Sequence, residues 1–493
     1  MLLGHAFNQL EHYRPASPSY HLLPFRFMRW RDGSVLVVND VGQHCFLASD
    51  DFAAFAAGRL SRTAESYREL RSRHFLRDSD STVSLQLLAT KYRTRMAHLA
   101  GFTKLHLFVV TLRCDHSCRY CQVSRVTSDR TRFDMKLEVA RRAVELVFRS
   151  PAERLKIEFQ GGEPLLNFDL VEAIVELALE TNVREGRRLE FVVASNLVPL
   201  TTAMLEFMAA HDMFVSTSLD GPAFLHDPNR PRPGSNSHEL VSDKISLVRE
   251  RLGRDHVSAI MTTTERSLEY PREIIDEYIR LGFDAVFLRP ISPYGFAVRT
   301  GEAARYQMER FLQFYREGLD YIIDLNRSGI PIMEIYAQIL LRKILTPFAT
   351  GYVDLQSPAG AVLGAVAYNF DGRVYASDEA RMLAAMGDDS FCLGHVDDGY
   401  EALFGGEVAQ ALAAGSVMES LPGCSDCAFL PFCGADPVFN YRSQGDIVGR
   451  KPTSAFCQKN MTTIGLLLGL LKDGDEFTRC LLTSWGTGIP ATS

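Results

Sequence analysis

Three cysteines, Cys114, Cys118 and Cys121, lie within eight residues, directly after the apolar stretch LHLFVV at 105–110. Three thiolates can hold an iron–sulfur cubane and leave one iron without a protein ligand, as a catalytic metal site requires. Zinc is the alternative, with His116 as a fourth ligand. It is disfavoured because no fourth thiolate lies nearby and His116 stands between the cysteines. The loop therefore predicts an open iron–sulfur site.

A second group comprises Cys424, Cys427 and Cys433, with Cys457 further along the chain. Clustered cysteines in a large chain without an export signal indicate metal ligands rather than disulfides. Four thiolates can close the shell of an auxiliary iron–sulfur cluster, and a zinc ribbon fits them too. The other three cysteines, Cys45, Cys392 and Cys480, are expected to be small buried hydrophobes.

A β/α pattern that begins near residue 105 would position the first cysteine group. Apolar segments typical of strands occur at 105–112, 155–160, 189–195, 213–219, 257–262 and 285–290. Segments with helical periodicity, such as LEVARRAVELVFR and FDLVEAIVELALE, separate most of them. The pattern predicts an α/β fold with a parallel sheet covered by helices, a partial (β/α)6 version of the eight-unit TIM-type barrel.

Unusual residues follow these predicted strands. The cysteines follow the first, GGEP (161–164) the second, Asn196 the third, DGP (220–222) the fourth and RPISPYG (289–295) the sixth. Because β/α barrels collect their chemistry at the carboxyl ends of the strands, we expect these residues to share one site.

The remaining segments suggest four regions. They are a small α+β module at 1–95, the partial barrel at 96–300, a helical connection at 301–350 and an auxiliary cluster domain at 351–493. Within the first region, a polar connection is expected near 77–100. In the last, AVAYNFDGRVYAS (365–377) predicts a hairpin through its Asp-Gly turn.

Composition limits the function classes. The 493 residues carry a net charge of -7, which gives no basic field for nucleic acid. The start, MLLGHAFNQLEHYRP, does not read as a secretory signal, and IGLLLGLL (464–471) is too short to span a bilayer. We expect a soluble, cytoplasmic protein that binds neither nucleic acid nor membrane.

The segment CDHSCRYC resembles the cluster motif of the radical S-adenosylmethionine (SAM) enzymes. The resemblance implies a [4Fe-4S] cluster whose open iron binds SAM, and reductive cleavage of SAM to a 5′-deoxyadenosyl radical. It also implies roles for further residues. The implied SAM-site residues are Tyr120, Gln160, Gly161, Gly162, Glu163, Ser195, Asn196, Ser218, Leu288 and Arg289. The implied catalytic candidates are Asp220, Asp378 and Glu379.

The second cysteine group resembles the SPASM extension of such enzymes, which implies an auxiliary [4Fe-4S] cluster on Cys424, Cys427, Cys433 and Cys457. This sequence departs from the full SPASM pattern. Pro437 and Ser377 stand where many relatives have cysteines. One auxiliary cluster is therefore expected rather than two, since Cys392 alone could not hold another.

Stretches between about 20 and 460 resemble the His-Xaa-Ser system radical SAM maturases. The resemblance implies a precursor peptide substrate with His-Xaa-Ser repeats that becomes cross-linked or otherwise modified. It also implies an electron donor of the flavodoxin or ferredoxin class and allows for a companion maturase. The module at 1–95 is similar to peptide-recognition domains that add a leader peptide to a sheet edge, and a packing cap is its alternative. A sulfatase-maturase-like activator and a non-catalytic iron–sulfur protein that binds peptides or senses redox state remain alternatives.

Overall fold

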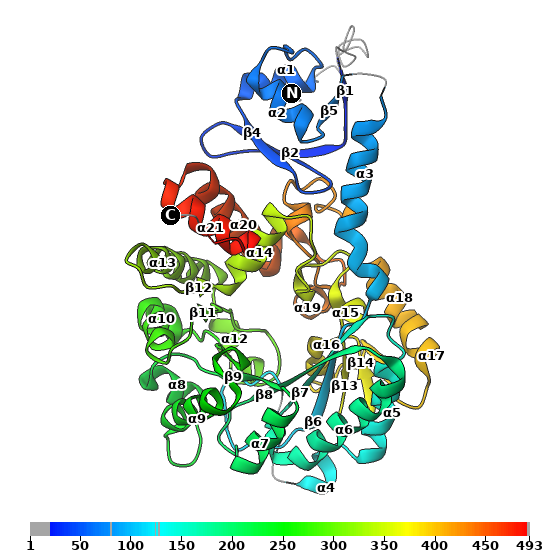
Figure 1. Ribbon diagram of the computed structural model, residues 1–493, viewed down its shortest axis with the longest axis vertical. Coiled ribbons are helices and arrows are strands. Elements are labelled where there is room, and N and C mark those ends of the chain that lie inside the picture. Colours follow the sequence, from blue (N-terminus) through cyan, green and yellow to red (C-terminus); the bar gives the residue numbers. More distant parts are fainter. Residues whose placement is uncertain (1–19, 79–80, 124, 127–128, 491–493) are drawn as a thin grey trace, which may run out of the picture.

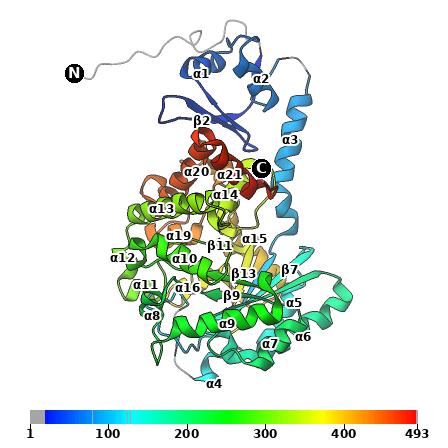
Figure 2. The same ribbon diagram turned by 60° about the vertical axis from the view of Figure 1, so that its left-hand side comes forward.

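The computed structural model describes residues 20–78, 81–123, 125–126 and 129–490 (Figures 1 and 2). The start of the chain, for which no secretory signal is expected, lies outside the described residues. Among the described helices, none is both long and apolar enough to cross a membrane.

The central element is an eight-stranded sheet with the order β10-β9-β8-β7-β6-β13-β14-β15. Neighbours from β10 to β13 pair in parallel, and β14 and β15 extend the sheet antiparallel. The strands are β6 (Leu105–Thr111), β7 (Arg154–Gly161), β8 (Arg188–Ser195), β9 (Phe214–Ser218), β10 (Val257–Ile260), β13 (Ala365–Tyr368), β14 (Arg373–Tyr375) and β15 (Cys392–His395).

Helices cover this sheet and bury their apolar faces against it. In α5 (Leu137–Val147), Ala140, Ala143 and Val144 lie at helical spacing and join Phe108 and Val110 of β6 in one core. The other helices between the strands are α4 (Arg130–Phe133), α6 (Phe168–Glu185), α7 (Thr202–Ala210), α8 (Ala223–Asn229), α9 (Ser237–Leu252) and α10 (Pro271–Arg280).

The predicted sixth strand differs from expectation. Only β11 (Ala285–Val286) forms, and it pairs with β12 (Met333–Glu334) instead of joining the main sheet. Glu334 explains the departure. Its carboxylate accepts hydrogen bonds from Leu288 N (3.1 Å) and Tyr315 Oη (2.6 Å), and so draws the chain after β11 toward β12. Thr263, beyond β10, still donates its backbone N–H to Arg289 O (3.0 Å).

The carboxy-terminal region contributes strands to the central sheet. The predicted hairpin forms as β13 and β14, but β13 also pairs in parallel with β6, which the sequence did not indicate. The other helices after β11 are α11 (Phe296–Arg299), α12 (Glu302–Arg305), α13 (Met308–Arg327), α14 (Ile335–Leu345), α15 (Gly360–Leu363), α16 (Asp378–Ala384), α17 (Tyr400–Gly405), α18 (Glu407–Ala414), α19 (Pro437–Gln444), α20 (Ala455–Asp473) and α21 (Glu476–Thr487).

Residues 20–77 form a separate core next to the carboxy-terminal helices (Figure 1). Its elements are β1 (His21–Leu22), β2 (Phe25–Arg29), β3 (Val35–Asn39), β4 (His44–Leu47), α1 (Ser49–Ala56), α2 (Glu65–Ser72) and β5 (Leu76–Arg77). The strand order β2-β3-β4 leaves β2 and β4 as edges. The expected polar connection is instead largely a helix, α3 (Val83–Met96), because its residues include many good helix formers.

Candidate active site

A cavity of about 260 Å³ opens at the carboxyl ends of the central strands. The side chains around it come from the loop after β6 and from the ends of β7, β8, β9 and β10, with α16 on one side. They include Cys114, Cys118, Cys121, Tyr120, Gln160, Gly161, Gly162, Glu163, Ser195, Asn196, Ser218, Arg289 and Asp378. The chain thus brings together residues that are up to 268 positions apart, from Cys114 to Met382.

Hydrogen bonds from later parts of the chain fix the cysteine loop. Ser117 N donates to Pro231 O (2.7 Å), and Phe296 N donates to Cys121 O (2.8 Å). Gly295, with φ +58°, lets this second segment approach, since a Cβ there would lie 2.5 Å from Cys121 O. All three thiols are free of disulfide bonds.

Tyr120, Asp220 and Arg230 form a buried network beneath the cysteine loop. The Tyr120 hydroxyl donates to Asp220, and Arg230 donates to both Asp220 carboxylate oxygens at 3.1 Å. The Arg230 guanidinium also lies 5.4 Å from the centre of the Tyr120 ring. The Asp220 carboxylate accepts a further bond from Thr262 N (3.2 Å) and is not among the groups that line the cavity. Asp220 thus lies beneath the loop and is held by these partners, and the catalytic role expected for it stays a prediction.

The GGE segment joins the ends of three strands. A Cβ on Gly161 would lie 2.0 Å from Thr111 O, and one on Gly162 would lie 2.1 Å from Arg113 O. The two glycines therefore allow the end of β7 to pack directly on the backbone before Cys114. From the sequence we expected these glycines to let a ligand approach the backbone. In the structure, the close contact that a side chain at either position would block is a contact with the protein backbone.

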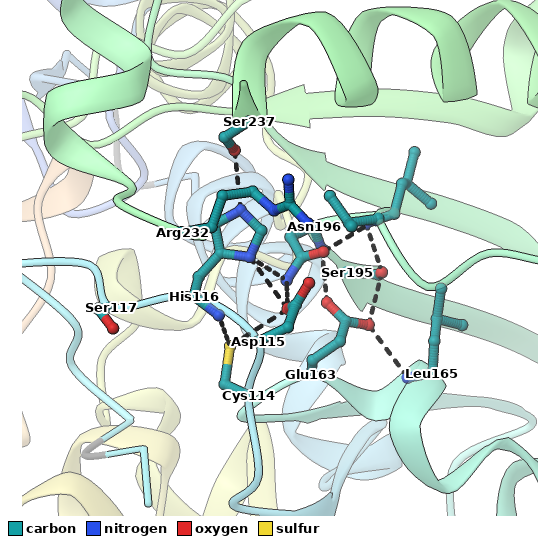
Figure 3. Close-up of polar contacts among 12 residues, drawn as sticks. Cys114, Asp115, His116, Ser117, Glu163, Leu165, Ser195, Asn196, Arg232 and Ser237 are labelled. Atoms are coloured by element: carbon teal, nitrogen blue, oxygen red, sulfur yellow. Dashed lines mark hydrogen bonds and ion pairs between the residues drawn. The ribbon is translucent and has the colours of Figure 1, made fainter. Parts of the chain in front are cut away.

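The Glu163 carboxylate is buried and ties β7 to β8 (Figure 3). It accepts from Ser195 Oγ (2.7 Å), Asn196 N (2.8 Å) and Leu165 N (3.0 Å). Burial raises the pKa of Glu163 to about 7, because the loss of hydration outweighs these hydrogen bonds. A cation bound beside it would favour the ionised form.

Both ring nitrogens of His116 already lie within hydrogen-bonding distance of protein groups, which disfavours this residue as a zinc ligand. Its Nδ1 lies 3.0 Å from Asp115 Oδ1 and 3.0 Å from Asn196 Nδ2, and its Nε2 lies 2.8 Å from Ser237 Oγ (Figure 3). Ligand atoms of Cys114, Asp115 and His116 do lie within 4.8 Å of one another. A zinc ion there would have to displace these hydrogen bonds.

Some sequence-predicted residues lie outside this cavity. Leu288 and Glu379 line an adjoining cavity instead. Sequence reasoning missed Ser216, Thr217 and Thr262, which line the cavity from the ends of β9 and β10. The signal for Ser216 and Thr217 was the polar run STS (216–218) at the end of an apolar strand.

The second cysteine group also converges. Burial raises the pKa of Cys424 to about 11, with Lys451 lowering it and the charges of Cys433, Cys427 and Cys457 raising it, so the four thiols share one neighbourhood. No three of these sulfur atoms lie within 4.8 Å of one another. In the described part of the chain, the only three potential metal-ligand residues that meet this distance are Cys114, Asp115 and His116. Cys45 is buried as expected, whereas Cys480 is exposed and does not fit that prediction.

The two departures from the SPASM pattern have structural roles. Ser377 caps α16, since its hydroxyl accepts from Ala380 N (3.2 Å). Pro437 is the first residue of α19, a position that needs no backbone N–H, and Asp436 caps the same helix. Each residue thus stands at the start of a helix.

Comparison with known proteins identifies the central part of the chain. Residues 108–278 match the radical SAM superfamily. These residues form a radical SAM domain. Among curated relatives, an uncharacterized protein of Methanocaldococcus jannaschii is 26% identical over 191 residues, which is 38% of this chain and 63% of that protein. An uncharacterized protein of Synechocystis is 28% identical over 231 residues, 43% of this chain and 56% of that protein. The chain thus spans less than two thirds of the length of both relatives.

Solved structures share the fold around the radical SAM domain. The enzyme anSMEcpe with bound AdoMet and the Kp18Cys peptide superposes with a TM-score of 0.61 and 17% identity, covering 78% of this chain and 99% of that one. SuiB of Streptococcus suis bound to precursor peptide SuiA gives a TM-score of 0.53 and 13% identity, covering 89% of this chain and 100% of that one.

Proposed function

We propose that this protein is a radical SAM enzyme that modifies a ribosomally made peptide. The observation that carries the proposal is the convergence of Cys114, Cys118 and Cys121 with the ends of four parallel strands around one cavity of a radical SAM domain. The comparison proteins anSMEcpe and SuiB, which share this fold, were both solved with peptides bound, and this supports a peptide substrate.

The residues present fit the groups that the proposal needs. Three free thiols supply a three-thiolate donor set. Gln160 Nε2 and Thr217 Oγ1 are buried at the cavity without hydrogen-bond partners, so polar atoms remain for an organic cofactor. A [4Fe-4S] cluster with an open iron, together with SAM, supplies a hydrogen-abstracting radical when both are bound.

The chain's own residues would bind and orient these groups. The three thiolates would hold the iron, and Arg230 and Asp220 fix, through Tyr120, the loop that carries these thiolates. The Glu163 carboxylate is proposed to face the cationic methionine amine, and Ser195 and Asn196 the ribose. Asp378, at the side of the cavity that α16 forms, and Glu379, in the adjoining cavity, remain candidates for proton transfer.

The finer assignment rests on sequence resemblance. We infer a precursor peptide with His-Xaa-Ser repeats, an electron donor of the flavodoxin or ferredoxin class, and one auxiliary cluster in residues 351–493. Strand addition at the edge strand β2 would let residues 1–95 bind a leader segment. Phe27, which is 52% exposed on this strand, offers an apolar contact to such a segment.

The test is anaerobic reconstitution with iron, sulfide and dithionite, followed by quantification of 5′-deoxyadenosine. We expect cleavage of SAM by the unmodified chain and none by Cys114→Ser, Cys118→Ser or Cys121→Ser. Cys480→Ser is the matched control, since this cysteine is exposed on α21. Equal cleavage by the three loop variants and the control would refute the proposal.

A further inference from the structure

Two further cavities adjoin the proposed cofactor cavity on the side of the carboxy-terminal region. The first, of about 180 Å³, shares four side chains with the cofactor cavity: Glu158, Gln160, Arg289 and Asp378. The second, of about 80 Å³, shares four with the first: Arg289, Asp354, Glu379 and Asp436. Arg289 lines all three, so the cavities lie next to one another around this side chain and form one system of adjacent cavities.

Three carboxylates converge at the far end of this system, and we call them the acidic pocket: Asp354, Glu379 and Asp436. They come from the turn Val353–Leu355, from α16 and from the first residue before α19. Burial and the charges of Asp354, Asp378 and Asp436 raise the pKa of Glu379 to about 8. Burial and the charge of Asp354 raise the pKa of Asp436 to about 7. The carboxylates thus repel one another in a poorly hydrated site.

Protein cations neutralise only part of this charge. Among the described residues, five carboxylates and two cations, Arg289 and Lys459, line the two adjoining cavities. Asp378 also pairs with the buried Arg381 (3.1 Å), which leaves an excess of two negative charges when all these groups are ionised. The Lys459 ammonium lies over aromatic rings, 4.7 Å from the centre of Tyr336 and 5.4 Å from that of Phe456. The pocket therefore favours a positively charged ligand.

Tyr294 gives a second and independent indication of a ligand. Its side chain is only 1% exposed, it lines the 80 Å³ cavity, and its hydroxyl has no hydrogen-bond partner. Burial raises the pKa of Tyr294, and the charges of the three acidic-pocket carboxylates add to this effect, so the hydroxyl lies in the field of the acidic pocket. A buried hydroxyl without a partner costs free energy that a ligand with N–H donors would recover.

A metal ion is a poorer fit than a cationic side chain. No three ligand atoms of the acidic pocket lie within 4.8 Å of one another in the described chain, so the carboxylates are not arranged as a metal site. The surrounding rings, Tyr336, Tyr352, Phe439 and Phe456, suit the methylene stem and charged head of a long basic side chain.

We propose that the acidic pocket is the subsite that receives a lysine or arginine side chain of the peptide substrate and thereby sets the register of the peptide at the cofactor cavity. This inference rests on the proposed function for its peptide. The substrate peptide would therefore contain a basic residue. The side chains that select this residue are Asp354, Glu379, Asp436 and Tyr294.

The experiment measures binding rather than turnover. The probes are fluorescein-labelled glycine–serine heptapeptides whose central residue is arginine, lysine, glutamine or glutamate. Their affinity for the reconstituted full-length protein with SAM is read by fluorescence anisotropy. We expect the arginine and lysine peptides to bind at least tenfold more tightly than the glutamine peptide. In Glu379→Gln/Asp436→Asn, this preference should fall at least fivefold while binding of the glutamine peptide changes less than twofold.

The variants are chosen to preserve the fold. Asparagine is as good a helix cap as aspartate, so Asp436→Asn retains the start of α19. Asp354→Asn provides a second test should the double variant melt at a lower temperature, and Glu172→Gln on the surface of α6 is the control. Equal affinity for the four peptides, or a preference that survives both pocket variants, would overturn the inference. Absence of 5′-deoxyadenosine together with a retained preference for basic peptides would refute the proposed function alone.

Discussion

Arg230 and Asp220 form a buried ion pair in which Nε and Nη2 of the guanidinium each lie 3.1 Å from a carboxylate oxygen. The Asp220 side chain is fully buried, and that of Arg230 is 12% exposed. The pair supports the loop that carries the three cysteines, through Tyr120 and through the bond from Ser117 N to Pro231 O. A structural ion pair thus lies directly beneath the proposed cluster.

We predict that Arg230→Met lowers the free energy of unfolding by about 4 kcal/mol, because it leaves the Asp220 charge buried without a partner. The double variant Asp220→Asn/Arg230→Met should be less destabilised, since it removes both charges. Urea unfolding of the apoprotein measures both values. Arg251→Met, which breaks a half-exposed pair with Glu206, is the control and should change stability by less than about 1 kcal/mol. A double variant no more stable than Arg230→Met would contradict the argument.

A second prediction concerns pH and Glu334. Burial raises the pKa of Glu334 from 4.5 to about 7, although Tyr315 Oη (2.6 Å), Ala337 N (2.6 Å) and Leu288 N (3.1 Å) donate to it. Between pH 4.5 and 7 the folded state keeps a proton that the unfolded state has lost, so this group makes stability fall as pH rises. The shift corresponds to about 3 kcal/mol across that window.

Glu334→Gln mimics the neutral form and should remove this part of the pH dependence. We compare the unfolding free energies of the variant and the unmodified chain at each pH. The variant should be the more stable of the two, and its advantage should be larger at pH 7.5 than at pH 5. Glu206→Gln, at a half-exposed carboxylate, is the control. A difference that stays constant from pH 5 to 7.5 would show that Glu334 is ionised throughout.

The third prediction tests the edge of β2. If a leader segment adds to this strand, Phe27→Lys should weaken peptide modification at least fivefold and leave peptide-independent cleavage of SAM unchanged. The reason is that Phe27 is half-exposed on an edge strand, where its ring lies against those of Phe52 (ring centres 4.7 Å apart) and Phe25 (6.4 Å). Leu179→Lys, at an exposed leucine of α6, is the matched control. Mass spectrometry of a coexpressed precursor peptide gives the measurement, and equal modification by both variants would make residues 1–95 a packing cap.

Five of the six predicted strands could be found from sequence because each is a continuous or alternating apolar run. The sixth could not be placed, since Ala285–Val286 pairs with Met333–Glu334, a partner 48 positions away that local periodicity does not reveal. The pairing of β13 with β6 was hidden for the same reason, with Ala365 opposite Leu105.

The candidate site was predictable where residues follow strands. Gln160 and Asn196 could be assigned to one edge because parallel strands end together. The acidic pocket could not be found in this way. Its three carboxylates lie on short helical elements after residue 350, and only the packing of those elements on the cofactor cavity brings them together.

The last prediction concerns the number of clusters. A tetrahedral zinc ion with bonds of about 2.3 Å would bring its sulfurs within roughly 4 Å of one another. In the described chain, no three sulfur atoms of the second cysteine group lie within 4.8 Å of one another; the group comprises Cys424, Cys427, Cys433 and Cys457. This wider spacing favours a cubane, because a cubane holds its cysteine sulfurs further apart than a zinc ion does. Since Ser377 and Pro437 cap or begin helices and supply no thiolate, a second auxiliary cluster lacks ligands.

We therefore expect about 8 iron atoms in each reconstituted chain and about 4 after all four auxiliary cysteines are changed to serine. Cys480→Ser should retain about 8, and zinc should stay substoichiometric. Because four protein thiolates close the shell, the fourfold variant should lose turnover or stability while its remaining cluster still binds SAM. Iron near 12 would reveal another ligand set, with Cys392 the first residue to test. Stoichiometric zinc with about 4 iron atoms would make the carboxy-terminal site a structural ribbon instead.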